Sequence, residues 1–224
     1  MEQMSAEETT RRLCYRCGQA ADTREHVVPR CFYPIKPNAP LVTVPACRSC
    51  NEALSKDEEY LRAVMVASAS SSRAAQVVWQ QKVAPSFQRD TWDGLRKQLA
   101  SGMREVFLPG PGGYLPHGLV KLDGARMDKV AEKIVRGLYC HVTGRIMPQD
   151  AEMRLHWRPK DWLPEFALRA ELINIDPDVF SCRYKIAAGS PRGISIWWML
   201  FYRTILYVVT ARHELAVQEA VGVV

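Results

Sequence analysis

The chain has 224 residues, of which 47% are apolar and 24% are charged, and this composition excludes a purely disordered protein. Lys and Arg number 30 against 24 Asp and Glu, so the formal net charge of +6 permits a polyanionic partner without establishing one. The seven cysteines are an odd number, and five of them precede residue 51. This distribution argues against a disulfide framework spread over the fold and favours a clustered metal site.

The first twelve residues, MEQMSAEETTRR, contain acidic side chains and no apolar segment. Neither a signal peptide nor a transit peptide is expected there, and we expect a cytoplasmic protein. Residues 12–55 contain five prolines that prevent a long helix, together with the clustered cysteines. We predict a small, loop-rich module that needs a cross-link, such as a bound metal ion, to hold it together.

Helical patterns follow this module. Ser55 begins a predicted helix whose first turn is acidic, which suits the positive end of a helix dipole. A second helix is predicted from about Ser86 through Met103, and the run LPGPGGYLP at 108–116 predicts a linker or a hairpin. Apolar residues recur at helical spacing from Gly124 to Val142, and Gly144 is expected to end that helix.

From Glu165 onward the sequence has strand character, and an antiparallel sheet with a helix against it is predicted. Residues 194–211 are nearly all apolar and about long enough to cross a bilayer, but Arg203 lies in their middle. We predict two core strands that turn near Arg203 rather than a membrane helix, with Trp197 and Trp198 on opposite faces. The predicted strands are ALRAELINI, DVFSCRYKIAA, ISIWWMLFY and TILYVVT.

These elements predict an α+β fold in three parts. Residues 1–62 form the cysteine-rich module, residues 63–107 a helical connector, and residues 108–224 an α+β C-terminal domain with an antiparallel sheet. The C-terminal domain is expected to serve substrate selection, dimerisation or regulation.

Two CxxC pairs give the strongest chemical signal. Two residues between thiolates allow each pair to grip one metal ion from a tight knuckle, and two knuckles complete a closed tetrahedral zinc site. Such a site has no open position for substrate, and it stabilises a module too small for its own core. We therefore predict one structural zinc ion, bound by Cys14, Cys17, Cys47 and Cys50.

Glu25 and His26 lie side by side between the knuckles, and Asn51 directly follows the last cysteine. An adjacent carboxylate and imidazole point to opposite faces of a strand or to neighbouring parts of a turn. One of them can then bind a metal while the other accepts a proton. Outside a zinc loop, the same pair would more simply be a surface charge pair.

The order CxxC, EHVVP, CxxC and Asn resembles the zinc-stapled branch of the HNH endonucleases, over residues 12 to about 62. The arrangement also resembles that of the phage junction-resolving endonucleases. The resemblance implies a ββα-metal fold, DNA as the substrate, and products with a 5′ phosphate and a 3′ hydroxyl. It makes His26 the general base, with Glu25 and Asn51 holding one Mg²⁺ or Mn²⁺ ion.

The physical chemistry agrees, because hard oxygen ligands suit Mg²⁺ and a neutral imidazole suits proton abstraction near pH 7. The chain departs from the family pattern in having Glu25 where Asp is more common and in having no clear middle Asn. Three residues are weighed as completing the site, Asn38, Asp57 and Glu58. A basic rim of substrate-binding residues is expected at Arg24, Arg30, Arg48 and Lys56.

The sequence thus predicts a phosphodiester hydrolase with DNA as its partner and no membrane association. Two alternatives stay open. One is a zinc-knuckle module that binds nucleic acid or protein without cleaving it, and the other is a nuclease subunit that acts only with a partner. A homodimer, or a larger defence or recombination complex, is compatible both with a free-standing nuclease and with a partner-dependent nuclease subunit.

Overall fold

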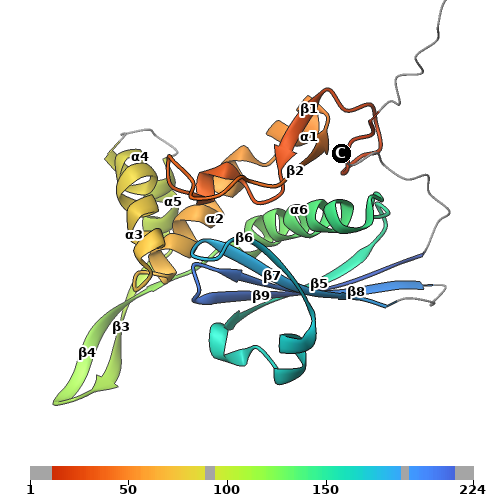
Figure 1. Cartoon of the computed structure of the whole chain (residues 1–224). Coiled ribbons are helices and arrows are strands. Elements are labelled where there is room, and N and C mark those ends of the chain that lie inside the picture. The colour runs from red at the N-terminus through yellow and green to blue at the C-terminus, as the bar shows by residue number, and fades with distance from the viewer. Residues whose placement is uncertain (1–11, 89–93, 188–191, 215–224) are drawn as a thin grey trace, which may run out of the picture.

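The computed structural model describes residues 12–88, 94–187 and 192–214, and it has a mixed α+β architecture (Figure 1). A long helix, α6, lies between an N-terminal hairpin module and a five-stranded antiparallel sheet (Figure 1). The predicted α+β class and the C-terminal antiparallel sheet with a helix against it are therefore confirmed. None of the helices in the described segments is long and apolar enough to cross a membrane.

The N-terminal module has a strand, strand, helix order. Strands β1 (Thr23–His26) and β2 (Thr43–Ala46) pair in antiparallel fashion, with Glu25 opposite Val44. The short helix α1 (Arg48–Glu52) follows β2 directly. The proline-rich loop between the strands includes one 3-10 turn and otherwise has no regular structure, as its four prolines predict, and the fifth, Pro45, lies in β2.

The helix predicted from Ser55 is present, but its small-residue run interrupts it. Helix α2 covers Ser55–Ser68, and Ser72 then caps α3 (Arg73–Val78) by accepting a hydrogen bond from the Ala75 amide at 3.5 Å. A π-helical turn, Trp79–Val83, joins α3 to the next helix. The remaining two helices of this region are α4 (Ala84–Gln88) and α5 (Leu95–Ser101).

The second predicted helix, about Ser86 through Met103, is therefore only partly correct. Its residues 89–93 lie outside the described segments, and its end at Met103 belongs to a strand. The run at 108–116 is the turn of a hairpin whose Gly112 and Gly113 have φ angles of +88° and +129°. Such left-handed backbone favours glycine. The hairpin strands are β3 (Met103–Gly110) and β4 (Gly113–Val120).

The C-terminal sheet has the order β5-β9-β8-β7-β6. Residues 194–211 form β8 and β9, which turn at Tyr202 and Arg203 as predicted. Sequence reasoning missed β5 and predicted strand where Glu165–Arg169 is a 3-10 helix. The five strands are β5 (Glu152–Pro159), β6 (Glu171–Asp176), β7 (Phe180–Ile186), β8 (Arg192–Phe201) and β9 (Ile205–Glu214).

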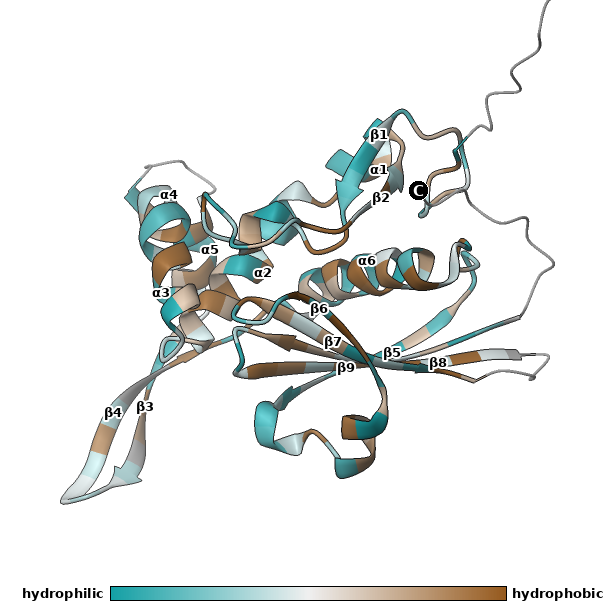
Figure 2. Ribbon diagram, viewed as in Figure 1, coloured by the Kyte–Doolittle hydropathy of each residue, from teal (hydrophilic) through white to brown (hydrophobic). Residues whose placement is uncertain are grey.

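Helix α6 (Gly124–Thr143) covers one face of this sheet, and apolar residues line its contact with the strands (Figure 2). It ends at Gly144, which has a φ angle of +66° as a left-handed C-cap requires. Trp197 belongs to the main core, whereas Trp198 packs in a smaller cluster, so the predicted opposite faces are confirmed. One buried cluster extends from Cys14 to Ala211, so the N-terminal module shares its core with α6 and the sheet.

Candidate metal centre and catalytic site

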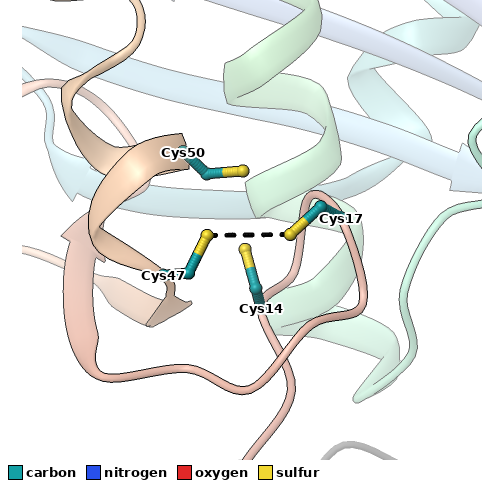
Figure 3. Close-up of side chains that lie close together, drawn as sticks. All are labelled: Cys14, Cys17, Cys47 and Cys50. Atoms are coloured by element: carbon teal, nitrogen blue, oxygen red, sulfur yellow. Dashed lines mark hydrogen bonds between the residues drawn. The ribbon is translucent and has the colours of Figure 1, made fainter.

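The four predicted cysteines converge at one end of the hairpin module (Figure 3). The first knuckle turns back at Gly18, whose φ angle is +74° and whose amide donates to the Cys14 carbonyl at 2.9 Å. The second knuckle is built into the start of α1, because Cys47 immediately precedes the helix and Cys50 lies in its first turn. Two segments distant in sequence thus present their thiols to one point.

The cysteine cluster fits a tetrahedral zinc ion. The four sulfur atoms lie within 4.8 Å of one another, and the Sγ atoms of Cys17 and Cys47 are 3.7 Å apart. A Zn–S distance of about 2.3 Å places the sulfur atoms of a tetrahedral site about 3.8 Å apart. These four cysteines could therefore hold a zinc ion, and their closed geometry is that of a structural site.

A backbone contact favours the thiolate form at Cys47, whereas burial raises the pKa of the Cys17 and Cys50 thiols. The Cys50 amide is the main cause that lowers the pKa of the Cys47 thiol to about 7. The far end of α6 also braces the first knuckle. Arg136 donates to the carbonyls of Met147 and Pro148 at 3.1 and 2.8 Å, and Gln149 in the same loop donates to the Arg16 carbonyl.

Strand β1 sends Glu25 and His26 to opposite faces, since successive strand residues alternate. The Glu25 side chain is 3% exposed, and its Oε2 accepts a hydrogen bond from the Tyr15 hydroxyl at 2.8 Å. Its Oε1 forms an ion pair with the Lys133 ammonium of α6, and Lys133 also pairs with Glu58 of α2. One buried ammonium is therefore shared between two carboxylates.

This network changes how Glu25 can act. Burial raises the pKa of Glu25 while the Lys133 charge opposes that rise. The resemblance expects Glu25 to be a metal ligand, whereas its carboxylate here has two protein donors. It is therefore not an open ligand in this arrangement.

Asn51, in α1, lies beside β1. Its Nδ2 donates to the Thr23 hydroxyl at 3.2 Å and to the Arg24 carbonyl at 3.4 Å. Thr23 and Glu25 share one face of β1 by alternation, so Asn51 approaches the strand from the Glu25 side. These contacts also tie α1 to β1 next to the cysteine cluster.

His26 is half-buried on the other face of β1. Burial lowers the pKa of the imidazole, and the positive charges of Arg30 and Lys133 lower it further. His26 is therefore neutral near pH 7, which is the form that accepts a proton.

The expected basic rim is exposed at all four positions, Arg24, Arg30, Arg48 and Lys56. Arg24 donates to the Thr43 side chain at 2.9 Å, which holds its guanidinium along β2. Arg30 is the member that acts on His26 through its charge.

The three residues weighed as completing the site have other surroundings. Asn38 is exposed and lines a separate cleft, Asp57 pairs with Arg126 at 2.5 Å, and Glu58 pairs with Lys133. Sequence reasoning missed both partners of Glu25. Lys133 gave no local signal, because a lysine within an amphipathic helix is ordinarily solvated.

The chain matches no protein-family model, no curated protein and no solved structure. Function must therefore be inferred from the geometry of the cysteine cluster and its neighbours.

Proposed function

We propose that this protein is a metal-dependent endonuclease that hydrolyses DNA phosphodiester bonds. One observation carries the proposal: a strand, strand, helix unit that four convergent cysteines close at one end also holds Glu25, His26 and Asn51. The order of these elements along the chain matches the order in the zinc-stapled HNH endonucleases that the sequence resembles, although Glu25 is here buried and paired with Lys133. The cysteine cluster would fix the unit, and the other three residues would carry the chemistry.

In the proposed reaction, His26 accepts a proton from a water molecule that attacks the scissile phosphate. The neutral state of the half-buried imidazole suits this role, and Arg30 is close enough to act on its pKa. The P–O3′ bond breaks as the new P–O bond forms, and the leaving O3′ takes a proton from solvent, which leaves a 5′ phosphate and a 3′ hydroxyl. Arg24 and Arg30 would hold neighbouring phosphates without reading sequence.

Asn51 and Glu25 are the residues that would hold Mg²⁺ or Mn²⁺. Such a cation neutralises charge that develops on the phosphate and on the leaving oxygen. The Asn51 amide nitrogen faces β1, so its Oδ1 is the atom suited to a hard cation. Glu25 could bind the cation only if its carboxylate gave up the ion pair with Lys133. Lys133 would then keep its ion pair with Glu58.

A cleavage assay with supercoiled, linear, branched and single-stranded DNA tests the proposal. We expect cleavage of at least one form that depends on added Mg²⁺ or Mn²⁺ while the zinc content stays constant. Absence of cleavage of all four forms by zinc-loaded protein would argue against a free-standing nuclease.

The pH dependence of cleavage provides a separate prediction. A general base must be neutral, so the rate should fall only as the pH drops through the pKa of His26, below its ordinary value of 6.5. Arg30→Ala removes a positive charge near the imidazole and should move this acidic limb to higher pH. Rate profiles of both proteins between about pH 4.5 and 8 measure the shift. Identical limbs would show that Arg30 does not act on the titrating group.

The Glu25–Lys133 pair favours a second candidate, a zinc-stapled module that binds DNA without cutting it. A buried lysine that already neutralises the acidic position removes the need for a divalent cation there. In that case DNA binding would persist in His26→Ala and would be indifferent to Mg²⁺.

A further inference from the structure

A cleft of about 930 Å³ opens beside the middle of the loop that joins β1 to β2. Its walls come from loop residues 34–38, the start of α3 and the turn between β8 and β9. Three cations line it, Lys36, Arg73 and Arg203, against one acidic residue, Asp178. Polar side chains of Asn38, Ser71, Ser72 and Gln81 complete much of the lining.

The positive charge of this cleft is poorly neutralised. Within the described parts of the chain, neither Lys36 nor Arg73 has an acidic partner, and both are exposed. Arg203 pairs with Asp178 at 3.3 Å, but their side chains are 71% and 57% exposed. An exposed pair of this kind is weak. Because three cations face one carboxylate, the cleft keeps a positive field.

Arg203 stands at a position that its own backbone disfavours. Tyr202 and Arg203 have φ angles of 50° and 59° at the centre of the β-turn Phe201–Thr204, and such angles at the two central positions favour Asn and Gly. Packing explains Tyr202, because it is fully buried and its hydroxyl donates to the Phe32 carbonyl at 2.7 Å. No comparable packing explains Arg203, and its guanidinium lines the cleft.

Contacts also connect the cleft to the candidate catalytic face. Lys82 donates to the Arg30 carbonyl at 3.0 Å, and the neighbouring Gln81 accepts from the Ile35 amide at 2.9 Å. The loop that carries Arg30 and Lys36 is therefore held against the π-helical turn that carries Lys82. A polyanion that is bound beside His26 would meet further cations along this loop.

We infer that this cleft binds backbone phosphates of the nucleic acid that the His26 face is proposed to cut, an inference that rests on the proposed function. Lys36, Arg73 and Arg203 bind the phosphates, and the surrounding amide and hydroxyl groups donate to phosphate oxygens. Asp178 holds Arg203 at the rim. Such contacts position the substrate without reading its sequence.

Binding without catalysis tests the inference. Fluorescence anisotropy with a short labelled DNA duplex, in the absence of Mg²⁺ and Mn²⁺, measures Kd between about 50 and 200 mM salt. The double variant Lys36→Ala/Arg73→Ala should raise Kd about tenfold at low salt and reduce the slope of log K against log salt by about 1 to 2. Lys185→Ala is the control, because it removes an exposed cation near the other end of β7.

Two single variants separate charge from folding. Arg203→Gly relaxes the turn, so the melting temperature should rise while Kd also rises several-fold. Asp178→Asn removes the negative charge and should lower Kd. If the Lys36/Arg73 and Arg203 variants bind DNA with the affinity and salt slope of the wild type, the inference is wrong.

Failure of the cleft inference can be distinguished from failure of the proposed nuclease function. Weaker binding by the cleft variants of a protein that never cuts DNA would support the cleft and reject the nuclease. Normal cutting and normal binding by the same variants would support the nuclease and reject the cleft. A wild-type protein that binds no DNA form would overturn the cleft inference itself.

Discussion

Replacing Cys47 by Ser is expected to remove most of the bound zinc and to unfold the N-terminal module. Cys47 is one of four ligands in a closed cluster, and it also precedes the helix that carries Cys50 and Asn51. Structural zinc contributes about 10–16 kcal/mol of apparent binding free energy in small modules. Whole domains are stable by only about 5–15 kcal/mol, so partial loss of zinc binding is a large effect.

Metal content and thermal unfolding, measured on the same samples, check this result. Cys31→Ala is the matched control, because Cys31 lies in the same module but outside the cluster. It should retain one zinc ion per chain. A Cys47→Ser protein with full zinc content and an unchanged melting temperature would contradict the assignment of the cluster as a structural site.

The second large effect is expected at Lys133. Lys133→Met leaves two carboxylates, Glu25 at 3% exposure and Glu58 at 15%, without their shared cation. Breaking a buried ion pair from one side typically costs about 3–5 kcal/mol, because the remaining charge stays buried. Lys129→Ala removes an exposed lysine one turn earlier in α6 and should change the stability by less than about 0.5 kcal/mol.

The pH dependence identifies the cause of that loss. Burial raises the pKa of Glu25 and the Lys133 charge opposes that rise, so without Lys133 the folded protein should hold a proton on Glu25 at a higher pH than the unfolded chain does. The free energy of unfolding of Lys133→Met should therefore recover as the pH falls from about 7 to 5. Adding Glu25→Gln to Lys133→Met should restore part of the stability at pH 7. A deficit that is independent of pH and of Glu25 would contradict the shared-cation account.

Local rules made much of the fold predictable. The CxxC spacing identified all four clustered cysteines, Gly144 ended α6, and the apolar run with Arg203 became two strands around a turn. Each CxxC pair, the glycine that ends α6 and the apolar run around Arg203 are signals within one short segment. The separation of Trp197 from Trp198 likewise follows from strand alternation alone.

The missed features depend on packing between distant segments. Strand β5 is an exception, because its alternating polar and apolar residues are a local strand signal that a search for apolar runs overlooked. Neither Glu25 nor Lys133 indicates its partner, since one lies in the hairpin module and the other on α6. The expectation of an open Glu25 carboxylate came from the resemblance, whereas its burial depends on where α6 packs.

The proposed endonuclease is tested most directly by comparing the wild type with His26→Ala in a Mg²⁺- or Mn²⁺-dependent DNA cleavage assay, at matched zinc content. His26 is outside the cysteine cluster and half-buried, so the variant should fold and keep its zinc. The account predicts cleavage by the wild type and a loss of at least about a hundredfold in the variant. Equal cleavage by the two zinc-loaded proteins would contradict it.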